Sequence, residues 1–319
     1  MVPLLYKNWI GLIVGVGMIL AIIFGLYMRS VMTRELYERV LTYICVLSLT
    51  STGYALIEKL MNVIMDGRHS HRISTVFLHP NYFGTIAATV IIICAYKVLT
   101  KQGSKGVYTA IAFANGISIY LSMSMFAWVE VFLGVSMLLV VLKKNRLFML
   151  WLLAAAVGAI AVFGLNLGLI PRLSDADTTI NLRQHIWALT VAKIKASPIF
   201  GHGFMSFLYL YHASYRGAPI PHSHSIYLDA LLNFGIVGSG LFLWFMGKYY
   251  FSLIKMRFQE MNVTITSLIL AVSVAALAHG TTDITLLGIQ TFPLLIIILS
   301  GLGADEKNGR YHINTDCFF

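Results

Sequence analysis

Charged side chains are scarce in this chain. Aspartate, glutamate, lysine and arginine make up 11% of its 319 residues, whereas 58% are hydrophobic. Soluble domains carry roughly 25% charged residues. The shortage excludes a soluble globular domain of ordinary composition and places the chain among integral membrane proteins.

Cysteine is also nearly absent. Cys45, Cys94 and Cys317 are scattered, and two of them lie within apolar runs, so they offer neither a disulfide framework nor a metal-binding spacing. The polar segment 171–223 holds His185, His202 and His212, but no cysteine and few carboxylates accompany them. Because a zinc site needs three or four ligands, we expect no metal, and no cofactor is indicated either.

Acidic residues are fewer than basic ones, 13 against 23, which gives a net charge of +10. Such an excess can indicate nucleic-acid binding. Here, however, the basic residues form short clusters between apolar runs, the pattern that sets the orientation of membrane proteins. We therefore expect the lipid bilayer as a partner and no nucleic acid.

Long apolar runs are abundant. A helix that crosses about 30 Å of hydrocarbon needs about 20 residues. Candidate spans of about that length lie near residues 8–28, 40–58, 80–99, 107–122, 125–142, 147–170, 232–254, 262–280 and 284–302. The first is too long for a signal-peptide core and lacks a cleavage site. The sequence thus predicts an all-α polytopic bundle of about nine spans, forming one transmembrane domain at residues 1–303 with a short tail at 304–319.

Basic residues mark one side of the membrane, because they concentrate in alternate loops. These residues are Arg29, Arg34, Arg39, Lys97, Lys101, Lys105, Lys143, Lys144, Arg146, Lys248, Lys255 and Arg257, with Lys307 and Arg310 in the tail. By the positive-inside rule this side is cytoplasmic. We expect a multi-pass protein of the cell membrane with its N-terminus outside, its C-terminus inside and the long loop 171–223 on the extracytoplasmic face.

The long loop contains one predicted helix, which follows Asp177 and ends before Pro198. We expect it to lie at the outer membrane surface. Arg183 precedes Trp187 by four residues, so the two side chains can stack. Arg183 is a candidate anion ligand because a guanidinium holds a phosphate through two parallel donors. The alternative is an arginine that only solvates the helix surface.

The stretch PHSHSIYLDALLNFGIVG, residues 221–238, follows the loop. In a continuous helix Gly235 would lie within roughly 20° of His224 and about three turns along, with Gly238 near the same line. Glycines there would let a neighbouring backbone approach. Histidine can act as a general base near neutral pH. His224 could instead be an interfacial or capping residue, and a metal site with His222 is disfavoured by the shortage of ligands.

Other polar residues are secondary candidates. Arg68 and Arg72 lie in a second outer segment, GRHSHRISTVFLHPNYFG, and could extend an anion site. Pro80 is well placed to begin a helix. Glu130 is a lone carboxylate within a span and thus a functional candidate, although it could simply reach water near the outer end.

These motifs together resemble the O-antigen ligase and Wzy-type polysaccharide polymerase superfamily. His224-Ser225, nine residues and then Gly235-x-x-Gly238 is similar to the family pattern H-[NSQ]-x9-G-x-x-[GTY]. Upstream, Arg183-x3-Trp187 and Pro198-x-x-Gly201-x-Gly203 resemble the family's external loop. TVFLHPNYFG at 75–84 and AHGTTD at 278–283 also fit, so the resemblance covers most of the chain from about residue 40.

The resemblance implies a reaction. It implies a membrane glycosyltransferase that moves a glycan from an undecaprenyl-diphosphate carrier to a glycan hydroxyl on the outer face, without a nucleotide sugar or a metal. His224 would activate the acceptor hydroxyl, and Arg183 would bind the diphosphate. The implied partners are the lipid-linked oligosaccharide, the acceptor glycan and other proteins of surface or capsular polysaccharide assembly.

The chain departs from the family in one segment. Where many members read L-S-R-G-A-W, with an arginine that helps to hold the diphosphate, this chain reads LSMSMFAWV and has Met125. Arg68, Arg72 or Arg216 could substitute, the donor could be held differently, or activity could be reduced. The nine predicted spans are also fewer than the family's usual ten to twelve, as in a divergent or truncated member.

Three other functions stay open at this point. Ligase-type transfer to another acceptor uses the same donor, so the sequence does not separate it from polymerisation. A transporter or flippase would need ionisable residues within its spans, which are almost free of them apart from Glu130. An inactive relative would only bind assembly partners.

Overall fold

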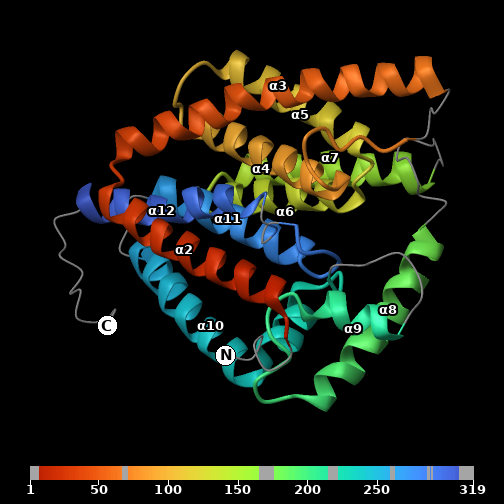
Figure 1. Ribbon diagram of the computed structural model, residues 1–319. Coiled ribbons are helices and arrows are strands. Elements are labelled where there is room, and N and C mark those ends of the chain that lie inside the picture. The colour runs from red at the N-terminus through yellow and green to blue at the C-terminus, as the bar shows by residue number, and fades with distance from the viewer. Residues whose placement is uncertain are drawn as a thin grey trace. The chain divides into compact units, whose positions relative to one another are not determined.

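The computed structural model describes residues 7–66, 71–164, 176–214, 222–258, 263–285, 288 and 290–308. Every regular element among them is helical (Figure 1). The elements are α2 (Trp9–Val31), α3 (Arg34–Asp66), α4 (Pro80–Leu99), α5 (Lys105–Ser122), α6 (Met125–Val141), α7 (Asn145–Ala159), the π-helix η1 (Ile160–Gly164), α8 (Ala176–Ala196), α9 (Ser206–Ser214), α10 (Ile226–Phe258), α11 (Val263–His279) and α12 (Phe292–Asn308). The predicted all-α class is confirmed.

Several of these helices could cross a membrane by length and composition. They are α2, most of α3, α4, most of α10, and α7 with the first residues of η1. Three further helices, α6, α11 and the apolar part of α12, are shorter. The count of nine spans and the outer position of residues 171–223 stay predictions.

Two helix boundaries differ most from the predicted spans. Helix α3 continues to Asp66, well past residue 58, and α12 begins at Phe292 instead of residue 284. Around Gly288 the backbone turns, since its N–H donates to Thr285 O (3.3 Å) and its carbonyl accepts from Thr291 N–H (3.0 Å). This turn delays the start of α12.

Local sequence explains where the helices begin. The Nδ1 atom of His79 accepts a hydrogen bond from Asn81 N–H (3.1 Å), and Pro80 occupies the first turn of α4. Both choices are favourable, because the first amide groups of a helix have no partner within it. The predicted helix start at Pro80 is confirmed. Helix α5 ends at Met123, whose positive φ of 51° allows α6 to begin two residues later.

The described residues form two compact units. The larger comprises residues 27–173, 256–279 and 285–319. Within it α4 packs against α5 and α6, and α11 packs against α6. Its core includes the small residues Ala87, Ala88 and Ala127, which let apolar helices approach closely. A Cβ atom on Gly134 of α6 would lie 2.3 Å from Ile92 Cδ1 of α4, so a larger residue there would displace the Ile92 side chain.

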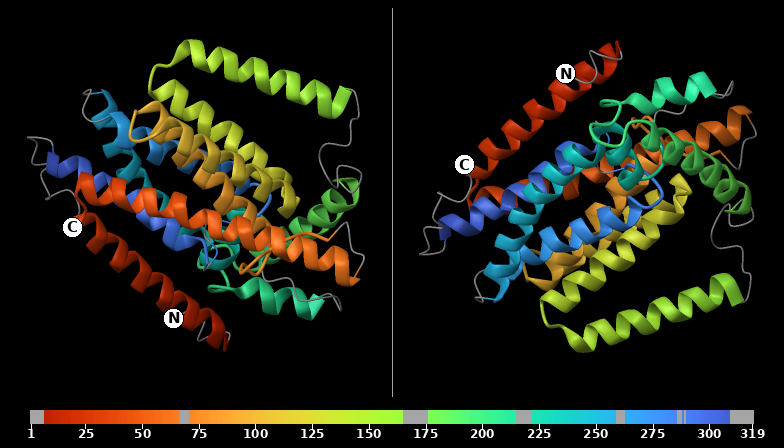
Figure 2. Two further views of the ribbon diagram at one scale, coloured as in Figure 1. Left: turned by 90° about the horizontal axis from the view of Figure 1, so that it is seen from above. Right: turned by 90° about the horizontal axis from the view of Figure 1, so that it is seen from below.

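Helix α7 lies at the margin of the larger unit in both views of Figure 2. None of its residues is buried, although the helix is strongly apolar. Exposed apolar surface of this kind is expected where a helix faces lipid, because lipid tails are as apolar as its leucines.

The smaller unit comprises residues 1–26, 174–255 and 280–284. Its core joins Ile186 of α8, Phe207 and Tyr211 of α9, and Leu232 of α10, all of them almost fully buried. The helix predicted between Asp177 and Pro198 is thus confirmed as α8, although its residues Ile180 and Leu182 are exposed. Whether α8 lies at the outer membrane surface stays a prediction.

Candidate active site

The segment between α8 and α9 contacts an interrupted turn of α10. Gly235 has φ 62° and ψ −168°, which is not helical, and it breaks α10. A Cβ atom added to Gly235 would lie 2.3 Å from Ile199 O, and one added to Gly201 would lie 2.6 Å from Gly235 N. Neither residue could carry a side chain here. The two glycines therefore permit a direct backbone contact.

Four backbone hydrogen bonds hold this contact together. They are His202 N–H to Leu232 O (2.8 Å), Gly203 N–H to Asn233 O (2.9 Å), Ile236 N–H to Pro198 O (2.9 Å) and Val237 N–H to Ile199 O (3.1 Å). A broken helix leaves carbonyl and amide groups without partners. The segment 197–204 supplies those partners on both sides of the break.

The predicted helical register between His224 and Gly235 is wrong. His224 precedes α10, which begins at Ile226, and its positive φ of 53° is not helical. Gly235 itself is not helical either, so the two residues do not belong to one continuous helix. Close approach of a backbone at Gly235 is confirmed, and the approaching segment is 199–201. Gly238 lies beyond the break, within α10, where its Cβ position faces Phe234 of the same helix.

His224 faces a buried carboxylate that sequence reasoning did not assign to the site. Its Nδ1 atom lies 3.3 Å from Asp283 Oδ1, and the Asp283 side chain is only 2% exposed. The His224 side chain is 22% exposed although its Nδ1 atom is buried, so the accessible part of the ring lies away from Asp283. The turn that carries Asp283 is fixed to the start of α10, because Ile226 N–H donates to Gly280 O (2.8 Å).

A second polar network fixes the backbone on either side of His224. Asp229 accepts hydrogen bonds from Ser223 N–H (3.0 Å) and from Asn233 Nδ2 (2.8 Å). Asn233 Oδ1 in turn accepts from the hydroxyl of Ser206 at the start of α9 (2.9 Å). Ser225 is buried, and its carbonyl accepts from Asp229 N–H (2.9 Å), which begins α10. The i, i+4 spacing of Asp229 and Asn233 was the available sequence signal for this network.

Comparison with known proteins identifies the domain that carries these residues. Residues 109–243 match the family model described as O-antigen ligase, a range that includes α8, α9 and His224. This part of the chain is therefore similar to the O-antigen ligases. Members of that family are membrane glycan ligases and polymerases, and the match supports a membrane enzyme of that general type. No curated protein matches the chain.

The arginines predicted to bind the diphosphate fall in different parts of the protein. Arg183 lies on α8, half-buried, in the same unit as His224. Arg72 lies in the larger unit. Arg68 and Arg216 lie outside the described residues. Diphosphate binding by all four stays a prediction.

Arg72 contacts the turn between α5 and α6. Its Nε donates to Ser122 O (3.0 Å), and its Nη2 donates to Asn81 Oδ1 (2.6 Å). Met125, which stands where many O-antigen ligases have arginine, begins α6 three residues after Ser122. The sequence could not show that an arginine from another segment reaches this turn.

Glu130 belongs to a buried polar cluster in the larger unit. Its Oε1 atom lies 3.0 Å from His279 Nδ1 on α11, and the Thr85 hydroxyl lies 3.3 Å from Glu130 Oε1 and 3.1 Å from His279 Nδ1. Both ionisable side chains are at most 2% exposed, and the Phe126 ring stacks on His279. The expectation that Glu130 could reach water is therefore wrong. Glu130 instead links α6 to α11 through His279 and to α4 through Thr85.

Replacing Glu130 with alanine should destabilise the larger unit. Removing one member of a buried pair leaves the other polar group without compensation and typically costs about 3–5 kcal/mol. We expect Glu130→Ala to unfold in detergent at a clearly lower temperature than the wild type. Glu130→Gln, which retains hydrogen-bonding atoms, should lose much less. Equal melting temperatures for wild type and Glu130→Ala would contradict a structural role for the cluster.

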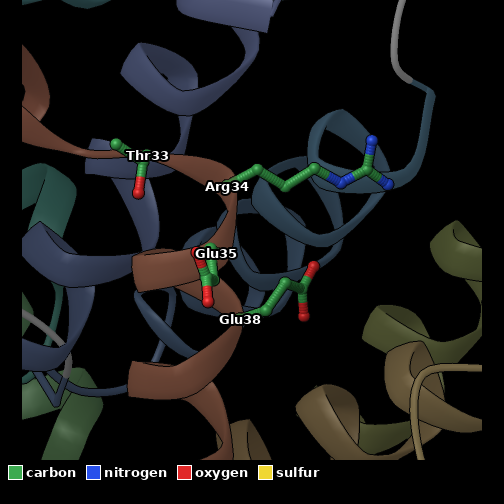
Figure 3. A pocket seen from close by; sticks show the side chains of 4 residues that line it. All are labelled: Thr33, Arg34, Glu35 and Glu38. Carbon is green, nitrogen blue, oxygen red and sulfur yellow. The ribbon is translucent and has the colours of Figure 1, made fainter.

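A wide cavity in the larger unit lies apart from the predicted site residues. It measures ≈ 680 Å³ and is lined by Thr33, Arg34, Glu35 and Glu38, at the start of α3 (Figure 3). Arg34 belongs to a basic cluster that the positive-inside rule predicts to be cytoplasmic.

Proposed function

We propose that this protein transfers a glycan from an undecaprenyl-diphosphate carrier to a hydroxyl group of an acceptor glycan, at the outer face of the cell membrane, in the polymerisation of surface or capsular polysaccharide. The observation that carries the proposal is the pairing of a partly exposed His224 with the buried Asp283 carboxylate. The family match supports the same reaction type.

In the proposed step, the acceptor hydroxyl gives its proton to the Nε2 atom of His224. The acceptor oxygen forms a bond to the anomeric carbon of the donor sugar, and the bond from that carbon to the diphosphate oxygen breaks. The departing lipid diphosphate takes the bonding electrons and the negative charge. A base positioned in this way contributes about 10²–10⁴-fold to a rate.

Asp283 is proposed as the positioning residue for His224. A carboxylate beside Nδ1 favours the tautomer with the proton on Nδ1, which leaves the lone pair on Nε2 free to accept a proton. It also stabilises the imidazolium that forms. The 3.3 Å separation is long for a charge-assisted hydrogen bond, and such contacts often tighten only when substrate is bound.

Arg183 and Arg72 are proposed to stabilise the leaving diphosphate. Fixed positive charge where negative charge develops lowers the barrier to its departure. Arg72 contacts the turn next to Met125, so it is our choice to replace the missing family arginine. This proposal requires no metal.

Replacing Asp283 with asparagine should lower kcat by two or more orders of magnitude and change KM little. The amide is similar in size but does not favour the catalytic tautomer, and a comparable substitution in serine proteases costs about 10⁴-fold. The measurement is glycan transfer by purified protein over a range of donor concentrations. Asp283→Glu should restore part of the rate. A change confined to KM would indicate that Asp283 contributes to substrate binding instead.

The reaction itself is tested by reconstitution. Purified protein in liposomes, given a labelled undecaprenyl-diphosphate oligosaccharide, should form longer lipid-linked glycans without a nucleotide sugar. Movement of the labelled lipid across the bilayer without new glycosidic bonds would instead identify a flippase. Transfer only to a different added acceptor would identify a ligase.

A further inference from the structure

Three potential metal ligands meet at the candidate active site. His222 Nε2 lies 3.6 Å from Asp283 Oδ1, and His224 Nδ1 lies 3.3 Å from the same oxygen. One ligand atom from each of the three residues falls within 4.8 Å of the others. A metal at His222 and His224 was not expected because the nearby sequence offers too few further ligands, whereas Asp283 comes from a distant part of the sequence.

The spacing of these donors fits a small divalent ion. With bonds of 2.0–2.2 Å to nitrogen and oxygen, neighbouring ligand atoms of a tetrahedral zinc ion are about 3.4 Å apart. The two histidine–aspartate separations, 3.3 and 3.6 Å, are already close to that value. Two imidazoles with one carboxylate suit zinc and similar transition metals, whereas magnesium and calcium prefer oxygen ligands.

Access and hydrogen bonding also permit binding. The side chains of His222 and His224 are 15% and 22% exposed, so both rings border solvent, although the Nδ1 atom of His224 is itself buried. The buried Nδ1 atom of His224 makes no hydrogen bond to the part of the chain that the structure describes. His222 Nδ1 accepts a 3.3 Å hydrogen bond from His224 N–H. A metal on His222 Nε2 would put the ring proton on Nδ1. The hydrogen bond from His224 N–H to Nδ1 would then be lost.

From this geometry we infer that His222, His224 and Asp283 form an inhibitory binding site for a divalent transition-metal ion such as Zn²⁺. Metal coordination requires a neutral imidazole. An ion on His224 Nδ1 therefore leaves the ring proton on Nε2, where no lone pair remains to accept a proton from the acceptor hydroxyl. The inhibition rests on the proposed function, whereas the binding does not.

Metal binding is tested with the purified full-length chain, carrying an affinity tag that contains no histidine. Calorimetry with ZnCl₂ should show one ion bound per chain, and Co²⁺ should give the absorption bands of a site with nitrogen and oxygen ligands. His222→Gln and Asp283→Asn should each weaken binding by about tenfold or more, since even outer-shell changes at metal sites have effects of that size. His185→Ala, at an exposed position on α8, is the matched control and should bind as the wild type does. Equal zinc affinity of the wild type and His222→Gln would show that these residues do not form the metal site.

Inhibition is tested in the liposome transfer assay. Zinc should reduce transfer by the wild type at concentrations that saturate the calorimetric site, and EDTA should reverse the effect. His222→Gln should transfer glycan at nearly the wild-type rate without zinc and should resist inhibition. Zinc that stimulates transfer, or that inhibits both proteins equally, would overturn the inhibitory role. If the wild type transfers no glycan at all, the proposed function fails, while calorimetry still decides the metal site.

Discussion

His224→Ala should reduce glycan transfer by about 10²–10⁴-fold, the usual contribution of a positioned general base. The acceptor hydroxyl would then have no group to take its proton as the new glycosidic bond forms. Because the His224 side chain is partly exposed and precedes α10, its removal should leave the fold intact. The measurement is transfer by purified protein in liposomes, with surface polysaccharide length in the native host as a second readout.

Two controls separate catalysis by His224 from a structural effect. His185→Ala removes an exposed histidine from α8 and should retain wild-type transfer. Added imidazole should restore part of the rate of His224→Ala, since the deleted ring leaves space beside Asp283. Polymer of unchanged length from a host that carries only His224→Ala would eliminate the proposed mechanism.

The second large effect is expected from Gly235→Ala. At φ 62° and ψ −168° the backbone adopts a conformation that is essentially restricted to glycine and costs other residues about 1–3 kcal/mol. The added Cβ would also lie 2.3 Å from Ile199 O and 2.6 Å from Gly201 N. Relief of that clash would separate the loop from α10 and break hydrogen bonds between them. We expect a markedly lower unfolding temperature in detergent and loss of transfer.

Gly240→Ala is the matched control on the same helix. No atom outside the helix's own backbone lies within 4 Å of its Cβ position, so alanine fits there without a clash. Alanine is also the better helix former, by about 1 kcal/mol. Gly240→Ala should therefore unfold at or slightly above the wild-type temperature. If Gly235→Ala behaves in the same way, the close backbone contact is not needed.

Local patterns in the sequence predicted the local features well. Apolar length located the helices, Pro80 marked the start of α4, and the residues between Asp177 and Pro198 indicated α8. Each of these features depends on neighbours a few residues away, which a single sequence displays directly. Glycine at position 235 likewise indicated close backbone approach.

Partners distant in the sequence could not be predicted in this way. Asp283 was visible within AHGTTD, but nothing in its spacing relates it to His224. Glu130 and His279 lie on separate apolar helices, and apolar patterns look alike whichever helices pack together. The predicted helical register from His224 to Gly235 was wrong, because a glycine is compatible both with a close contact between helices and with a break in its own helix.

The interruption of α10 also determines how this protein could be recombined with its relatives. In hydrocarbon, backbone groups must find partners within the protein, and here those of residues 232–237 find them in the segment 198–203. Each segment supplies hydrogen-bond partners for the backbone of the other, so neither can be exchanged by itself. A chimaera that exchanges the segment between α8 and α9 alone would join mismatched halves, and the portable piece is that segment together with the glycine turn of α10.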